Sequence, residues 1–211
     1  MSGQGCTNAI LLAAGGSTRL GRPKQLLPWN GSTLLGSTIQ RLAEAGCERL
    51  IIVVGAYEPE VREHCIAPHH LQLHIVTNNE WRRGQATSLR AGIEYAVAAK
   101  DSGPTVIALC DQPLIDSTHY RELVASVSCR GYLAAATEYP EGLGVPACFS
   151  WSALQSLSVA SGDSGAKSWL REQPPHTVDR VACPSAVTDV DTEINYQQLN
   201  AISGSVKHSR Q

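Results

Sequence analysis

The sequence has no excess of charge of either sign. Its 17 lysines and arginines nearly balance 19 aspartates and glutamates, which leaves a formal net charge of −2. A chain with this balance has no overall field that would draw it onto nucleic acid or an anionic membrane. We therefore expect neither partner, and any phosphate group must be bound by a local cluster of charges.

A long apolar run is also missing. No stretch reaches the roughly 18 to 20 residues that cross a bilayer, and the start MSGQGCTNAI has neither the charged nor the apolar part of a signal peptide. We therefore expect a cytoplasmic protein without a membrane-spanning helix.

Paired metal-binding cysteines are absent too. Seven cysteines occur, but none forms a CxxC pair and no histidine stands at the spacing of a zinc site. Cys110 ends an apolar run, and a nucleophilic thiol is one interpretation, although nothing near it in sequence supplies a base. In a reducing compartment such a cysteine is more often a small buried hydrophobic residue. We expect neither a disulfide framework nor a zinc site.

What the sequence does contain is enough apolar material for one core. Of its 211 residues 43% are hydrophobic, and this length favours one domain over two. Short β-branched or Leu-rich segments alternate with segments of helical periodicity, which predicts an α/β fold with a mainly parallel sheet and helices on both faces. The expected strands are residues 8–13, 49–54, 71–76, 105–109 and 132–136, and the expected helices are residues 33–45, 58–65, 85–99, 120–127, 165–170 and 193–202.

The pattern changes after Pro140. The stretch GLGVPACF predicts an outer strand, because Pro146 has no N–H to donate inside a sheet. Residues 1–7 and 204–211 are expected to be flexible ends, so the predicted domain spans residues 8–203.

The most informative stretch is LLAAGGSTRLGRPK, residues 11–24, directly after the first predicted strand. Glycines at the carboxyl end of a parallel strand let backbone N–H groups surround phosphate oxygens. An ordinary glycine-rich turn is the alternative, but Arg19 and Lys24 add cations that favour triphosphate binding. The loop is not a Walker A motif, since Gly21 is not followed by Lys and Ser or Thr, and its glycines lack the GxGxxG spacing of dinucleotide folds.

A carboxylate is expected opposite this loop. Asp111 stands just after the strand at residues 105–109, where its side chain would face the same crevice. Magnesium prefers one or two carboxylates together with substrate phosphates, so Asp111 is a candidate ligand. A turn or helix-capping role is the alternative, but Asp116 is better placed to cap the next helix.

More acidic residues occur in TDVDTE near the end of the chain. Asp189 and Asp191 alternate with Val190, so on an extended segment they point the same way. A second metal carboxylate and a solvated acidic turn are both consistent with this pattern. Thr192 is expected to cap the last helix.

Several motifs, in this order, resemble those of the molybdenum cofactor cytidylyltransferases, which are related to the molybdopterin guanylyltransferases. They are LLAAGGSTRLGRPKQLLPWNGSTLL, NNEWRRGQATSLRAGI, ALCDQPLI, GLGVPACF, GDSGAK and DVDTEINYQQL. The resemblance runs from about Ala9 to Leu199 and implies a single Rossmann-like nucleotidyltransferase domain. In GDSGAK the family's usual arginine is replaced by Lys167, and Leu143 and Val145 stand where the family often has a basic residue and Asn.

The resemblance also implies how the site is divided. It implies catalytic roles for Arg19, Lys24 and Asp111, and Mg²⁺ held by Asp111 and Asp191. The implied nucleotide-binding residues are Ala13, Ala14, Gly15, Gly16, Ser17, Arg19, Lys24, Gly84, Gln85 and Ser88. The implied acceptor-binding residues are Gly144, Pro146, Gly162, Asp163, Gly165 and Lys167.

The expected reaction is transfer of CMP from CTP to the phosphate of a molybdopterin-type cofactor, with release of pyrophosphate. The opening LAAG resembles the cytidylyl branch, whereas guanylyl enzymes typically carry LAGG, and we expect the methyl group of Ala14 to crowd a purine. A molybdoenzyme or its chaperone is the expected receiver of the product. The alternatives are transfer of GMP or another nucleotide to a different phosphorylated molecule, and a non-catalytic molybdopterin carrier. An NAD-dependent oxidoreductase is disfavoured by the missing fingerprint.

Overall fold

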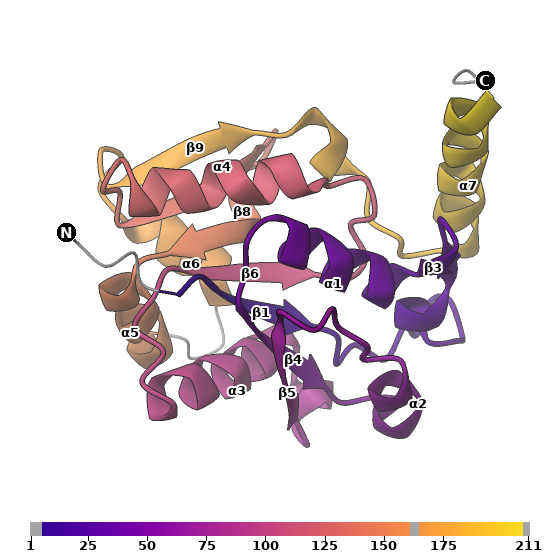
Figure 1. Ribbon diagram of the computed structural model, residues 1–211, viewed down its shortest axis with the longest axis horizontal. Helices are drawn as coiled ribbons and strands as arrows, with labels where there is room; N and C mark the ends of the chain where they lie inside the picture. The colour runs from indigo at the N-terminus through magenta and orange to yellow at the C-terminus, as the bar shows by residue number, and fades with distance from the viewer. Residues whose placement is uncertain (1–5, 161–164, 209–211) are drawn as a thin grey trace.

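The computed structural model describes residues 6–160 and 165–208 of the chain. A seven-stranded sheet has the strand order β5-β4-β1-β6-β8-β7-β9 (Figure 1). The strands are β1 (Asn8–Leu12), β4 (Arg49–Val54), β5 (Gln72–Thr77), β6 (Thr105–Leu109), β7 (Ala134–Tyr139), β8 (Gly142–Phe149) and β9 (Val178–Ala182). The helices are α1 (Leu34–Glu44), α2 (Glu58–Glu63), α3 (Gln85–Ala98), α4 (Ser117–Ser128), α5 (Trp151–Ala160), α6 (Gly165–Glu172) and α7 (Glu193–His208).

The sheet is mainly parallel, as expected. Strand β1 pairs in parallel with both β4 and β6, and β4 pairs in parallel with β5. Strand β8 runs antiparallel to its neighbours β6 and β7, while β9 is parallel to β7. The carboxyl ends of β1, β4 and β6 therefore meet at one edge, where the loops that follow them gather.

Alternating side chains of β1 separate the core into two layers. Ala9 and Leu11 pack in the layer formed with α1, α2 and α4, whereas Ile10 and Leu12 pack in the layer formed with α3, α5 and α6. All four side chains are at most 8% exposed. This period of two across a sheet covered on both faces explains why the strand is a continuous apolar run. The expectation of helices on both faces is confirmed.

The helix ends carry typical capping residues, and the caps at Asp116 and Thr192 were predicted from the sequence. Thr33 precedes α1 and accepts a hydrogen bond from Gly36 N at 3.0 Å, and Gly46, with φ of +91°, lies just beyond that helix. Asp116 caps α4 through its contact with His119 N at 3.0 Å. Thr192 caps α7 by accepting from Asn195 N at 3.2 Å. Helix α7 continues to His208, so it is longer than predicted and extends into the end segment expected to be flexible.

The prediction of an outer strand at GLGVPACF is wrong, since β8 lies inside the sheet between β6 and β7. Pro146 is accommodated because the pairing avoids it: β6 pairs only with the stretch from Ala147 to Phe149. Opposite β7, the register moves from Ala147 directly to Gly144, which forms a bulge. Pro146 therefore needs no N–H, and its carbonyl accepts a hydrogen bond from Thr137 Oγ1 at 2.7 Å.

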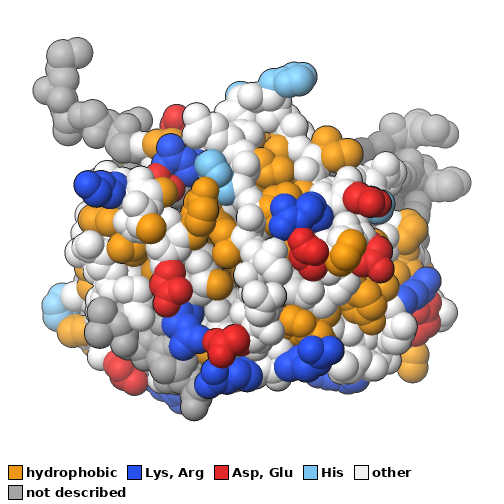
Figure 2. Space-filling model, turned by 90° about the horizontal axis from the view of Figure 1, so that it is seen from below, with side chains coloured by type: hydrophobic (Ala, Val, Ile, Leu, Met, Phe, Trp, Pro, Cys, Tyr) orange, Lys and Arg blue, Asp and Glu red, His pale blue; other side chains and the backbone are white. Residues whose placement is uncertain are grey.

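A small β-hairpin lies beside the last helix of the chain. Strands β2 (Pro28–Trp29) and β3 (Ser32–Thr33) pair in antiparallel fashion, and α7 stands beside them (Figure 1). A separate apolar cluster joins Trp29 and Leu34 to Val190 and Leu199. On the face drawn in Figure 2, acidic and basic side chains are interspersed. Within the described part of the chain, no helix combines the length and the apolar composition needed to span a membrane.

Candidate active site

The glycine loop after β1 is fastened to the protein by a residue that the sequence reading missed. The side chain of Gln25 is fully buried, and its Nε2 donates to the carbonyl oxygens of Ala13 at 2.8 Å and Gly15 at 2.9 Å. Ser17, with φ of 48°, accepts a hydrogen bond from Lys24 N at 3.0 Å through its Oγ. The loop is therefore closed on itself, and these contacts restrict its backbone without a ligand. The sequence offers no signal for this role, because the burial of Gln25 and its two contacts are visible only in the structure.

Four predicted site residues meet in one ion-pair cluster at this edge of the sheet. Lys24 Nζ lies 2.5 Å from Asp111 Oδ2 and 3.1 Å from Asp191 Oδ1. Arg19 adds a contact of 3.3 Å to the other oxygen of Asp191. Burial disfavours the charged form of Lys24, but the charge of Asp111 and their hydrogen bond outweigh this and raise the pKa of Lys24 above its usual value. Residues from three distant segments thus form one polar site.

Asp111 and Asp191 are held at the same place by the backbone. Val190 N donates to the carbonyl oxygen of Asp111 at 2.9 Å, which ties the last loop to the end of β6. The side chain of Asp111 is 14% exposed and that of Asp191 is 39% exposed. Asp111 Oδ1 is buried and has no hydrogen-bond partner among the described residues.

These donors fit a hard divalent cation. An unpartnered buried carboxylate oxygen beside a second carboxylate is the ligand type that Mg²⁺ or Mn²⁺ prefers. The described residues contain no cluster of three or more His, Cys, Asp or Glu side chains arranged for a metal. Further ligands would therefore have to come from phosphate oxygens or water, as is usual for Mg²⁺.

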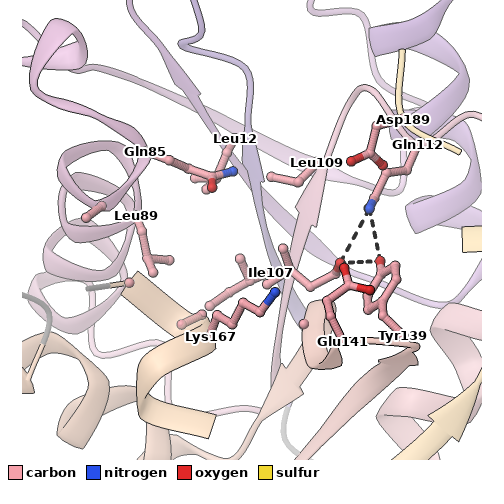
Figure 3. A pocket seen from close by; sticks show the side chains of 15 residues that line it. Leu12, Gln85, Leu89, Ile107, Leu109, Gln112, Tyr139, Glu141, Lys167 and Asp189 are labelled. Carbon is pink, nitrogen blue, oxygen red and sulfur yellow. Dashed lines mark hydrogen bonds between the residues drawn. The ribbon is translucent and has the colours of Figure 1, made fainter. Parts of the chain in front are cut away.

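Asp189 has a different environment from Asp191. Asp189 lies beside Gln112 and lines a cavity next to the ion-pair cluster, whereas Asp191 pairs with Arg19 (Figure 3). Although the residue as a whole is exposed, partial desolvation of its carboxylate and the negative charge of Asp111 raise the pKa of Asp189 to about 6. The two aspartates of TDVDTE thus lie in adjoining places, one lining the cavity and one in the ion-pair cluster.

A cavity of about 240 Å³ lies next to the ion-pair cluster (Figure 3). Its apolar wall is formed by Leu12, Ile107 and Leu109 from the sheet and Leu89 from α3. Polar side chains surround this wall, and the labelled ones are Gln85, Gln112, Tyr139, Glu141, Lys167 and Asp189. An apolar wall with a few polar groups at its edge is typical of a small-molecule site.

Gln112 and Tyr139 fix one end of this cavity, and neither was predicted from the sequence as a site residue. Gln112 Nε2 donates to Tyr139 Oη at 3.0 Å, and Tyr139 Oη donates to the carbonyl oxygen of Val145 at 2.6 Å (Figure 3). This network links the segment after Asp111 to the bulge in β8. It places a tyrosine from the end of β7 beside the predicted acceptor site.

The structure brings some predicted acceptor residues together and separates others. Gly144, Gly165 and Lys167 line the cavity, and so does Gln85, which was predicted to bind nucleotide. Pro146 is buried below the cavity rather than lining it. Gly162 and Asp163 lie outside the described residues.

Gly84 precedes α3, and residues 85–88 form the first turn of this helix. Gly84 has φ of +114°, a conformation that favours glycine. Ser88 is buried, and its Oγ accepts a hydrogen bond from Asn78 Nδ2 at 2.9 Å. Ser88 therefore supports Asn78, another residue not anticipated from the sequence, whereas Gln85 is exposed toward the cavity.

The methyl group of Ala14 does not face open space. Ala14 is 3% exposed, and its Cβ would lie 2.9 Å from a Cβ placed on Gly55. The expectation that this methyl group crowds a purine directly is therefore wrong. Any effect of Ala14 on the nucleotide must pass through the position of the loop.

Cys110 has no nucleophilic character in this structure. It is 3% exposed, and burial raises the pKa of its thiol to about 12. The expectation of a small buried hydrophobic residue is confirmed. Covalent catalysis through this cysteine is disfavoured because the thiolate is not accessible near neutral pH.

Comparisons with known proteins agree with this geometry. Residues 9–178 match the MobA-like NTP transferase domain. The nicotine blue oxidoreductase of Paenarthrobacter nicotinovorans is 34% identical over 196 residues, which cover 89% of this chain and 93% of that protein. The molybdenum cofactor cytidylyltransferase of Escherichia coli K12 is 31% identical over 86 residues, covering 41% of this chain and 43% of that protein.

A solved structure extends the likeness to nearly the whole chain. The crystal structure of Rv0371C from Mycobacterium tuberculosis H37Rv in complex with manganese has a TM-score of 0.69 and 27% sequence identity, and it covers 92% of this chain and 97% of that one. The family match spans the glycine loop, the strand-end aspartate and the β7–β8 hairpin described above. The chain belongs to the MobA-like NTP transferase domain family.

Proposed function

We propose that this protein is a divalent-metal-dependent nucleotidyltransferase that moves CMP from CTP to the terminal phosphate of a molybdopterin-type acceptor. The observation that carries the proposal is the meeting of Lys24, Asp111 and Asp191 beside the glycine loop. A closed loop of backbone donors, two cations and a pair of carboxylates is the set of groups that phosphoryl-type transfer requires.

In the proposed reaction an oxygen of the acceptor phosphate attacks the α-phosphorus of CTP. A new P–O bond forms there, the bond between the α-phosphorus and the bridging oxygen breaks, and pyrophosphate leaves. The attacking phosphate is already anionic near neutral pH, so no Ser, Cys or His nucleophile is needed. The protein has to bring two negatively charged groups together and offset their repulsion.

Each residue of the cluster has a part in this task. Asp111 and Asp191 are placed to hold a divalent metal ion, which when bound supplies positive charge for the triphosphate. Arg19, exposed at the mouth of the loop, neutralises the phosphates as they arrive. Lys24, held beside the carboxylates, offsets the charge that grows around the α-phosphorus.

The choice of CTP and of the acceptor rests on two supports. The cytidylyltransferase of Escherichia coli is a relative, and the LAAG opening at residues 12–15 resembles that branch. The cavity offers an apolar wall for a flat ring system and polar groups, including Lys167 and Glu141, for its edges. A cytoplasmic location and delivery of the product to a molybdoenzyme or its chaperone belong to the same proposal.

One observation favours a second candidate function. A relative that aligns over 89% of this chain bears the name of an oxidoreductase, so a redox reaction on a small molecule in the same cavity is the second candidate. The glycines at positions 15, 16 and 21 lack the spacing of a dinucleotide fingerprint, and this argues against that reading. We therefore place nucleotidyl transfer first.

One experiment separates these functions. The purified protein is incubated with Mg²⁺, a molybdopterin-type acceptor and CTP or GTP, and pyrophosphate release is followed while the conjugate is identified by mass. We expect release with CTP, and a kcat/KM for CTP that exceeds that for GTP. A preference for GTP would replace the cytidylyl assignment but keep the transferase. Oxidation of NADH or NADPH without pyrophosphate release would favour the second candidate.

A further inference from the structure

Two adjacent glycines in the loop meet different surroundings. A Cβ placed on Gly15 would find no non-neighbouring atom of the structure within 4 Å, so space is open there for a ligand. A Cβ on Gly16 would lie 2.8 Å from Cζ3 and 3.2 Å from Cη2 of Trp81. Gly16 is therefore a glycine because the edge of an indole ring occupies the space of its side chain, whereas no such contact explains Gly15.

The same indole side chain excludes a second Cβ at the end of β4. A Cβ on Gly55 would lie 2.8 Å from Trp81 Cβ and 2.9 Å from Ala14 Cβ. The backbone joins these segments as well, because Ala56 N donates to the carbonyl oxygen of Ala14 at 3.1 Å. Trp81 is thus lodged between the strand end and the glycine loop and touches both.

Contacts with neighbouring residues restrain Trp81 and the segment that carries it. The guanidinium of Arg82 lies 4.4 Å from the centre of the Trp81 ring. The buried side chain of Asn78 accepts a hydrogen bond from Glu80 N at 2.9 Å and donates to Thr87 Oγ1 at 2.9 Å. Asn78 N also donates to the carbonyl oxygen of Val54 at 2.8 Å. The segment that carries the indole is therefore bonded both to α3 and to the end of β4, which restricts the position of the ring.

We propose that Trp81 is a positioning residue for the glycine loop. Its indole edge sets where the backbone of Gly16 lies and so directs the loop N–H groups toward the phosphates of the nucleotide. This inference rests on the proposed function, because it takes the loop to be the phosphate site. Trp81 acts through the loop and needs no contact with the nucleotide.

Calorimetric titration with CTP and Mg²⁺, without acceptor, tests this through two double-mutant cycles. The first cycle combines Gly16→Ala with Trp81→Ala, and the control cycle combines Gly15→Ala with Trp81→Ala. In the wild-type background we expect Gly16→Ala to weaken CTP binding by about tenfold, and in the Trp81→Ala background by less than about threefold, since residues in contact are not additive. Gly15→Ala should weaken binding by the same factor in both backgrounds, because no indole atom lies near that position.

The conservative variant gives a second readout. Trp81→Phe keeps an aromatic edge and should retain CTP affinity within about threefold, whereas Trp81→Ala should lose about tenfold. If the Gly16→Ala variant does not fold, the comparison of Trp81→Phe with Trp81→Ala tests the inference alone. CTP binding by Trp81→Ala as tight as that of the wild type would overturn it. Equal penalties for Gly16→Ala in both backgrounds, with wild-type CTP binding intact, would overturn it while leaving the proposed function standing. A wild type that binds no CTP would contradict both.

Discussion

At the scale of single residues, Lys24 occupies the position between the two carboxylates expected to bind a metal. Its ammonium contacts Asp111 at 2.5 Å and Asp191 at 3.1 Å. A divalent cation held by these two aspartates, as proposed, would meet a like charge there, so it would compete with Lys24 for the carboxylates. Arrival of the triphosphate would offer Lys24 another anionic partner and release the carboxylates, which links nucleotide binding to metal binding.

This competition predicts opposite effects of one substitution. Lys24→Met should abolish most turnover, yet it should tighten Mn²⁺ binding to the nucleotide-free protein by about tenfold, because a charge about 4 Å away is worth roughly 1 to 4 kcal/mol. Electron paramagnetic resonance of free Mn²⁺ measures the affinity. Lys100→Met, at an exposed position in the connection between α3 and the amino end of β6, is the matched control and should change neither quantity. Weaker Mn²⁺ binding by Lys24→Met would contradict the competition.

Gln25 supports the loop in a way that can be separated from catalysis. Replacing it by Leu leaves the carbonyl oxygens of Ala13 and Gly15 without their donor, and a buried polar group left unpaired costs about 1 to 3 kcal/mol. We expect Gln25→Leu to lower the free energy of unfolding by this amount and to raise the KM for CTP more than it lowers kcat. Gln40→Leu, at an exposed glutamine that bonds to Glu44, is the control. Urea unfolding and steady-state kinetics measure both effects, and an unchanged KM would contradict a supporting role.

At the scale of elements, the sequence reading worked where local chemistry decides the structure. The apolar run of β1, the helix that covers most of residues 33–45 and the cap at Asp116 each depend on neighbours in sequence, and each was found. Strand β9, with sequence VDRVA, was missed because an edge strand with alternating charges resembles a loop. Pro146 misled the prediction because a bulge, which depends on the pairing of two strands, made room for it.

The same reasoning explains which site residues were found. Lys24 and Asp111 stand beside glycines or at a strand end, so their types and places indicate chemistry. Trp81 contacts the glycine loop from a segment distant in sequence, whereas the side chains of Asn78 and Gln25 donate to residues only 9 to 12 positions away. Neither kind of contact is visible as periodicity or as a motif in the sequence. The sequence thus indicated the residues proposed to contact substrate and missed those that hold them in place.

The start of α4 offers a test that separates an effect on stability from an effect on catalysis. Asp116 accepts a hydrogen bond from His119 N and caps α4, only five positions after Asp111 in the printed sequence. Asp116→Ala should lower the free energy of unfolding by about 1 kcal/mol, the usual effect of losing such a cap, and leave kcat unchanged. Asp111→Asn should do the reverse, with little loss of stability and loss of most turnover. Thermal unfolding and kinetics of both variants distinguish the two aspartates, and near-native activity of Asp111→Asn at saturating Mg²⁺ would remove its metal assignment.

At the scale of the whole molecule, the segment before α7 lies in the same candidate site as the glycine loop that follows β1. Asp191 reaches Lys24 because the segment before α7 is bonded to Asp111 and α7 is packed on the β2–β3 hairpin (Figure 1). Tyr196 Oη donates to the carbonyl oxygen of Pro28 at 2.7 Å, and Arg22 pairs with Glu193 at 2.7 Å. The position of one proposed metal ligand therefore depends on the docking of a helix.

This dependence predicts that a core substitution remote from the chemistry will impair it. Leu199 is fully buried in the cluster with Trp29 and Leu34, and Leu199→Ala should lower the free energy of unfolding by about 2 to 5 kcal/mol. Loosening α7 should also displace Asp191, so kcat and Mn²⁺ affinity should fall even at temperatures where the variant is folded. Leu157→Ala, at a fully buried position of α5 in the core layer formed with α3 and α6, is the matched control: a similar loss of stability is expected there, with kcat and Mn²⁺ affinity unchanged. Equal effects of the two substitutions on Mn²⁺ affinity would show that α7 docking has no special part in placing Asp191.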